Sequence, residues 1–262
     1  MNTNLLTQIT VIQKLLERDF YLFKQLFLHR LKMALYWVLI TVFVTKMFMP
    51  AMGLPNFAPF ILISSAISYG FFVAMHNAMS LVEDITGDQA ILYELSLPVP
   101  QWAIFFKFAL TTMFQSFVIS ISIVPFGLMV LMDLHAFKDF SWAKFMIIFI
   151  VSNVFYGSFS LILATFLKNM SQIDNVWLRI LFPMWYLGCY QFPWSTLYEI
   201  SPTIAYLSFL NPMTFIAEGA RSATINTAGS LPFSVCCFMI LFYAAISCIA
   251  GIYWMKKRLD CL

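Results

Sequence analysis

The histidines, glycines and carboxylates of this chain are too scattered to build a catalytic or metal site. The three histidines, His29, His76 and His135, lack the spacing of metal ligands. The nine glycines include no G-x-x-x-x-G-K-[ST] loop, whose backbone amides would hold a nucleotide phosphate. Few ionisable side chains fall inside the apolar stretches, which argues against ion-driven transport. We therefore expect no catalytic residue, no metal and no cofactor bound by this chain, and a membrane-embedded enzyme is the least favoured class.

Residues 83–100 form a polar, acidic segment between two long apolar stretches. Thr86 and Gln89 have the spacing of a capping box, so a short helix should begin there. Pro98 and Pro100 should end it. A short helix with acidic ends and apolar side chains is typical of a docking element, and a plain interfacial loop is the alternative. The candidate docking residues are Asp84, Thr86, Gly87, Asp88, Gln89, Ile91, Leu92, Glu94, Leu95 and Pro98.

Residues 194–223 are too apolar for a free loop and too often interrupted by proline for a span. Asn211 is a good helix N-cap and Pro212 a good first helical residue. Glu218 and Arg221 are three residues apart, so they can pair on that helix. Backbone that does not span the membrane survives at membrane depth only where it is buried in protein or lines a cavity. We therefore expect two short re-entrant helices that enter the outer leaflet and return.

Aromatic side chains are concentrated just before and within this second segment. Tyr190, Phe192 and Trp194 are the candidates for a substrate path that suits an amphiphile or a glycan. Tyrosine and tryptophan also gather at membrane interfaces without contacting any substrate. An aromatic belt is therefore the alternative interpretation.

Composition indicates the surroundings in which these segments must be positioned. The chain has 262 residues, of which 61% are hydrophobic and 10% charged. A soluble domain is about half apolar and a quarter charged, so the bilayer must act as the solvent. Residues 5–30 place apolar side chains at steps of three and four and the charged residues Lys14, Glu17 and Arg18 opposite. This pattern predicts a helix in the membrane interface within residues 1–32, and an amphipathic helix packed on another subunit is the alternative.

Six apolar stretches of roughly spanning length follow, at about 20 residues each. With six spans, 11 of the 15 basic residues lie on one side, and the positive-inside rule then places both termini in the cytoplasm. The chain is thus expected to be a single transmembrane domain, residues 1–262, with a bundle over 33–255 and a cytoplasmic tail over 256–262. The predicted spans are Met33–Met49, Phe57–Val82, Phe105–Met132, Phe145–Leu167, Val176–Phe192 and Leu231–Met255.

Three motifs in this order resemble those of the ABC type-2 exporter permeases. Leu95-Ser96-Leu97-Pro98-Val99-Pro100 resembles the family's turn after its coupling helix. The dipeptide Phe192-Pro193 stands where the family often has one, just after span five. Asn211-Pro212-Met213-Thr214-Phe215, with Glu218 and Arg221 following, resembles its Asn-Pro-x-Thr-aromatic signature before span six. The resemblance covers essentially the whole chain. It implies an all-α fold with six spans, an N-terminal interfacial helix, a cytoplasmic coupling helix over residues 83–100 and re-entrant helices over 194–223.

The resemblance also implies partners and a substrate class. Two copies of the permease, expected as a homodimer, would work with two copies of an ABC ATP-binding subunit, which would use the ATP and Mg. The expected location is the bacterial inner membrane among its lipids, and no nucleic acid is involved. A hydrophobic drug or lipid is the first expectation for the substrate, and a lipid-linked polysaccharide is the alternative. A six-helix channel or scaffold that needs no ATP is the alternative from another class.

Overall fold

The computed structural model describes residues 5–54, 57–132, 137–138, 140–167, 169–225 and 229–259. Within these residues the chain is helical and contains no β-strand. Five helices are long and apolar enough to cross a membrane, and a helix satisfies all of its backbone hydrogen bonds without water. The chain therefore has the architecture of a helical membrane protein. The five are α1 (Leu5–Phe48), α2 (Phe57–Thr86), α4 (Gln101–Leu131), α5 (Trp142–Phe166) and α11 (Phe233–Leu259).

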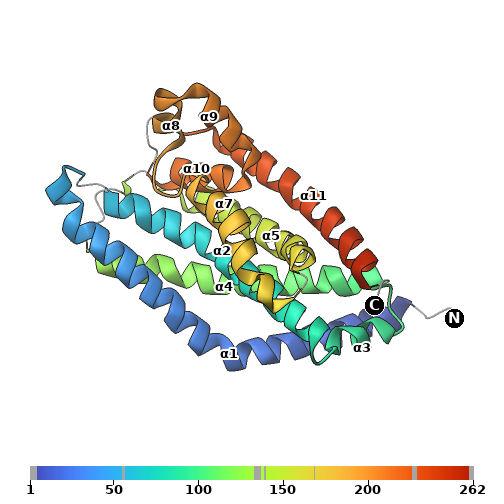
Figure 1. Ribbon diagram of the computed structural model, residues 1–262. Coiled ribbons are helices and arrows are strands. Elements are labelled where there is room, and N and C mark those ends of the chain that lie inside the picture. Colours follow the sequence, from blue (N-terminus) through green and yellow to red (C-terminus); the bar gives the residue numbers. More distant parts are fainter. Residues whose placement is uncertain are drawn as a thin grey trace.

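Helix α1 joins two elements that the sequence pattern separates. The predicted interfacial helix, residues 5–30, and the predicted span Met33–Met49 form one continuous helix that ends at Phe48. No break separates them, because the stretch from Leu5 to Phe48 contains no proline or glycine that would interrupt the helix, and the interfacial position of residues 1–32 stays a prediction. The ribbon of α1 instead changes direction along its length (Figure 1).

Helix α2 lies at the centre of the bundle. In its most apolar window 83% of the residues are buried, against 17% in α1 and 28% in α11. Small polar residues line its packed faces, including Ser64, Ser65 and Ser68, and small residues let membrane helices approach closely. A small residue also lets α5 pack closely against α4 at Gly157. Any larger residue there would place its Cβ only 2.3 Å from the Ala109 carbonyl oxygen of α4, which is too close for a side chain.

The predicted fifth span, Val176–Phe192, is not one regular helix. It overlaps three short consecutive pieces, and the helix ends at Tyr186, so its predicted extension to Phe192 is wrong. A wide π turn interrupts the regular α geometry, and Cys189 then adopts a left-handed φ of 57° in the turn that follows. The six-span layout remains a prediction. The pieces are α6 (Ile173–Val176), η4 (Trp177–Leu181) and α7 (Phe182–Tyr186), and the single turn η3 (Met170–Gln172) precedes them.

Short helices occupy the two ends of the bundle. Both termini and α3 (Ala90–Ser96) lie at one end, while α8 (Trp194–Ile200) and α9 (Pro202–Leu207) lie at the other (Figure 1). The single turn η5 (Ser208–Leu210) and helix α10 (Pro212–Thr224) complete the region before α11. Residues 194–223 therefore form three short α-helices where two were expected.

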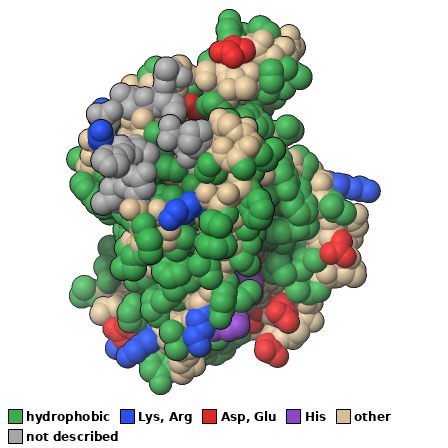
Figure 2. Space-filling view, turned by 90° about the vertical axis from the view of Figure 1, so that its left-hand side faces the viewer, with side chains coloured by type: hydrophobic (Ala, Val, Ile, Leu, Met, Phe, Trp, Pro, Cys, Tyr) green, Lys and Arg blue, Asp and Glu red, His purple; other side chains and the backbone are tan. Residues whose placement is uncertain are grey.

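Apolar side chains cover the outside of the bundle as well as its core. Phe238 and Ile249 of α11 are 67% and 72% exposed. Figure 2 shows hydrophobic side chains over most of one face, with several charged ones towards its lower edge. A surface of this kind suits lipid and is too apolar for water.

Candidate functional site

Helix α3 is the predicted docking element, and its start is organised by Asp84. The Asp84 carboxylate accepts hydrogen bonds from the backbone N–H groups of Ala90 and Ile91, at 3.0 and 2.8 Å. The predicted capping box is wrong, because Thr86 still belongs to α2 and donates its hydroxyl to the Val82 carbonyl. Gln89 stands at the N-cap in a left-handed conformation without a side-chain cap.

The docking candidates divide between two faces of α3 and its flanks. Ile91 and Glu94 are buried against the bundle, whereas Tyr93 is 67% exposed. Half-buried positions are Asp84, Leu92 and Leu95. The candidates left exposed are Thr86, Gly87, Asp88, Gln89 and Pro98.

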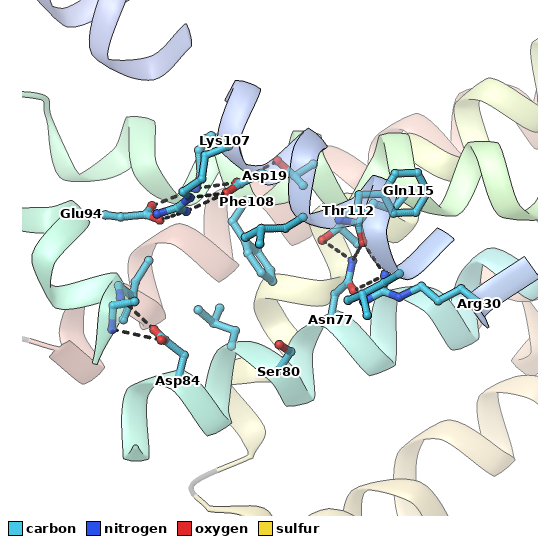
Figure 3. Close-up of a pocket in the computed structure, with 18 residues that line it drawn as sticks. Asp19, Arg30, Asn77, Ser80, Asp84, Glu94, Lys107, Phe108, Thr112 and Gln115 are labelled. Carbon is cyan, nitrogen blue, oxygen red and sulfur yellow. Dashed lines mark hydrogen bonds and ion pairs between the residues drawn. The ribbon is translucent and has the colours of Figure 1, made fainter. Parts of the chain in front are cut away.

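Glu94 belongs to a cluster of four charges that joins three helices. Lys107 of α4 lies between two carboxylates, at 2.7 Å from Asp19 Oδ2 of α1 and 2.9 Å from Glu94 Oε2 (Figure 3). Arg18 of α1 pairs with Asp19 at 2.6 Å and also with Glu94. The side chains of Lys107 and Glu94 are only 4% and 5% exposed. We call these four residues the charge cluster; it is neutral overall and holds α3 to α1 and α4.

A cavity of ≈ 380 Å³ lies beside the charge cluster and between the same helices. At its far side, Arg30 of α1 donates through Nη1 to Gln115 Oε1 at 2.6 Å and to Asn77 Oδ1 at 3.1 Å. Asn77 in turn donates to Gln115 Oε1 and to Thr112 Oγ1. Figure 3 shows that these side chains come from three different helices and meet along the cavity wall. Polar groups buried between membrane helices are typically paired in this way.

These two networks were not found from the sequence. The interpretation assigned Glu94 to an outer partner, whereas its carboxylate faces the bundle. Lys107 gave a usable signal, because it is the one charged residue within the apolar stretch Phe105–Met132. An ionisable residue inside such a stretch usually faces a partner in the bundle. Its partners lie too far away along the chain for spacing to reveal them.

At the other end of the bundle, the start of α10 confirms the local prediction. Asn211 Oδ1 accepts from the Met213 N–H at 3.1 Å, and Pro212 is the first helical residue. The Asn211 amide also donates to the Met184 carbonyl at 2.6 Å, which ties α10 to α7. Thr214 donates to the Ser208 carbonyl at 2.9 Å, and Phe215 stacks on Phe209. The signature residues therefore hold several short helices together.

Glu218 and Arg221 pair as expected, at 2.5 Å, and both side chains are fully buried. Arg221 also donates to the carbonyl of Cys189 and to Ser64 Oγ of α2, the latter at 3.2 Å. Glu218 Oε1 accepts from the Trp194 N–H at 2.9 Å. The guanidinium carbon of Arg221 lies 4.1 Å from the centre of the Phe60 ring. This buried pair thus fixes the turn between α7 and α8 onto α10 and α2.

The candidate path residues are engaged in packing. The Tyr190 hydroxyl shares a 2.7 Å hydrogen bond with Ser65 Oγ, and the side chain is buried. Trp194 donates its indole N–H to the Ala205 carbonyl at 3.0 Å and stacks on Phe209. Phe192 is half-buried, and its carbonyl accepts from Arg221 at 3.4 Å. None of the three lines the cavity beside the charge cluster.

In the part of the chain that the structure describes, no group of three or more His, Cys, Asp or Glu side chains could hold a metal ion. His135 lies outside the described residues. Comparisons of the chain with protein-family models, with curated proteins and with solved structures found no match. The functional argument therefore rests on the residues and their geometry.

Proposed function

We propose that this chain is the membrane-spanning permease subunit of an ATP-driven ABC exporter. Helix α3 is the observation that carries the proposal. It is a seven-residue helix at one end of the bundle, between α2 and α4 in the chain. One face is fastened to the bundle by the charge cluster, and the opposite face presents Tyr93 outward. A short helix of this kind can fit a cleft in a partner and pass on its movement.

The fastening supports a mechanical role for α3. Because Asp84 holds its start and Glu94 its middle, a push on α3 reaches α1, α2 and α4 together. Closure of an ATP-binding partner would then move these helices as a rigid group, in a hinge or shear transition. The buried pair at the other end keeps the α7–α10 region attached to α2 during such a movement.

The proposed complex has two permease copies and two ATP-binding subunits in a bacterial inner membrane, with both termini in the cytoplasm. The substrate would be a hydrophobic or amphiphilic drug or lipid, taken from the cytoplasm or the inner leaflet. A lipid-linked polysaccharide is the second substrate class. The partner would supply the ATP hydrolysis, and the permease would supply the path.

Gentle purification of the tagged chain from its native membrane tests the proposal. An ATP-binding subunit in stoichiometric amount is expected with the wild type and not with Tyr93→Ala. Tyr253→Ala is the matched control, because Tyr253 is also a tyrosine, 63% exposed, on α11. Both variants should melt at the wild-type temperature.

Two outcomes would contradict the proposal. If no ATP-binding partner is recovered in several mild detergents, the permease assignment fails. If the partner is retained by Tyr93→Ala and by a combined Asp88→Ala, Gln89→Ala and Tyr93→Ala variant, α3 is not the contact. Conduction by the reconstituted chain without nucleotide would favour the channel alternative.

A further inference from the structure

Arg30 is a half-buried cation with no counter-ion among the described residues. Only its Nη1 atom is engaged, by the neutral amide oxygens of Asn77 and Gln115. Its Nη2 and Nε atoms have no hydrogen-bond partner in the described part of the chain, and no described carboxylate forms an ion pair with it. A partly desolvated charge costs free energy unless an anion compensates it. The positive charge of Arg30 therefore lacks a counter-ion among the described residues.

A second cavity, of ≈ 260 Å³, opens beside Arg30 between α1, α2 and α4. His29 and Arg30 of α1 and His76 of α2 form its polar part, and no carboxylate lines it. In Figure 2 the histidine side chains lie together near the lower edge of the face, with basic side chains on one side and acidic side chains on the other. The nearest acid along α2, Glu83, is seven residues from His76, or about 10 Å at the rise of an α-helix. The polar part therefore favours an anion.

Apart from the half-buried Tyr69 of α2, the rest of the cavity lining is apolar and lies on one side of this polar part. Met33 stands one helical turn beyond His29 on α1, and Phe72 stands one turn before His76 on α2. The second half of α1 and α2 run in opposite directions (Figure 1). Met33 and Phe72 therefore both lie farther from the α3 end of the bundle than the two histidines do. Met33 is 58% exposed, so the apolar wall opens outward. This arrangement matches an amphiphile with an anionic head and an apolar tail.

We propose that this cavity binds the phosphate head group of an anionic lipid from the leaflet at the α3 end of the bundle. Arginine binds phosphate through paired, charge-assisted hydrogen bonds, and two donor nitrogens of Arg30 are available for them. Histidines flank the phosphate, and the apolar wall takes the start of an acyl chain. Free phosphate shares the head-group chemistry and lacks the tail, so the apolar wall selects the lipid. The inference goes beyond the proposed exporter function, because binding needs neither ATP nor a partner.

Native mass spectrometry of the purified full-length chain in detergent tests this site. Phosphatidylglycerol should bind more tightly than phosphatidylcholine, and inorganic phosphate should not compete at equal concentration. Arg30→Gln should weaken phosphatidylglycerol binding about tenfold, the effect expected for losing a hydrogen bond to a charged group. Lys32→Gln is the matched control, because Lys32 is an exposed base on the same helix that does not line the cavity. It should bind as the wild type does.

A second variant covers the case in which Arg30→Gln does not fold. Met33→Glu changes an exposed position and places a carboxylate beside Arg30, so it should also weaken phosphatidylglycerol binding. The proposal is overturned if Arg30→Gln, or Met33→Glu in its place, binds as the wild type does. It is equally overturned if Lys32→Gln loses as much affinity, if phosphatidylcholine binds equally well, or if inorganic phosphate displaces the lipid.

Discussion

The charge cluster and the buried pair of Glu218 and Arg221 lie at opposite ends of the molecule and differ in what they connect and in how buried they are. The charge cluster joins residues up to 88 positions apart, since Lys107 of α4 pairs with Asp19 of α1, and Arg18 in it is 44% exposed. The buried pair joins residues three apart in one helix, and both side chains are fully buried. Water reaches the charge cluster at Arg18, although Lys107 and Glu94 are buried in it, whereas it reaches neither side chain of the buried pair.

This difference teaches where the molecule can move. Water screens and replaces an exposed ion pair at little cost, whereas a buried charge that loses its partner is strongly destabilising. We therefore expect α3 to loosen from the bundle more readily than α10, while the buried Lys107–Glu94 pair still lets it pass a push to the bundle. The following predictions test that contrast, from the largest effect to the smallest.

Arg221→Met should give the largest loss of stability. It leaves the Glu218 carboxylate buried without its cation, which costs about 3–5 kcal/mol in the free energy of unfolding. Thermal melting in detergent measures the loss. The double variant Glu218→Gln, Arg221→Met removes both charges and should recover most of it. An Arg221→Met variant that melts at the wild-type temperature would show that the buried pair stabilises nothing.

Lys107→Met should have a smaller effect, about 2 kcal/mol, because Arg18 pairs with both carboxylates and remains to compensate for part of their charge. Hydrogen exchange should rise in α3 and stay unchanged in α10. Lys14→Met is the control, since it removes the same charge from an exposed pair with Glu17 and should change neither. Equal exchange in α3 and α10 would contradict the contrast between the two ends.

Asp84→Ala should cost about 1 kcal/mol, the usual effect of removing a helix cap. The loss should be local, with faster exchange at the Ala90 and Ile91 amides. Thr86→Ala should leave these amides unchanged, because the Thr86 hydroxyl bonds within α2. Faster exchange in the Thr86 variant alone would restore the capping box that the sequence suggests.

Tyr190→Phe should have the smallest effect, up to about 1 kcal/mol, because it removes only the hydrogen bond to Ser65. Ser65→Ala removes the same bond from the other side, so the double variant should lose no more than either single one. In a transport assay Tyr190→Phe should retain wild-type activity if Tyr190 belongs to the core. A loss of transport without a loss of stability would favour the substrate path.

The predictions from short sequence patterns are confirmed where the contacts in the structure join residues close together in the chain. Asn211 caps a helix that begins at the next residue, and Glu218 meets Arg221 one turn later. Such contacts depend on a few neighbouring residues and on helix geometry alone. The capping box at Thr86 failed because α2 extends through that residue, and the length of a helix depends on what packs along it.

Distant contacts could not be read from the same patterns. The bond between Arg18 and Glu94 joins residues 76 positions apart, and that between Arg30 and Gln115 joins residues 85 apart. Without related sequences to compare, nothing in the chain indicates which polar residue meets which. For the same reason the sequence did not indicate that Glu94 points inward, or that Arg30 lacks a counter-ion among the described residues.

The sequence by itself determined the class of this protein, its long apolar helices and the local caps. Those properties follow from composition, from apolar stretch length and from contacts within one helical turn. Only the tertiary structure decided that the fifth apolar stretch is broken and which face of α3 is free. The physical reason is that burial and charge pairing depend on which helices become neighbours, and that choice is made by the packing of the whole bundle.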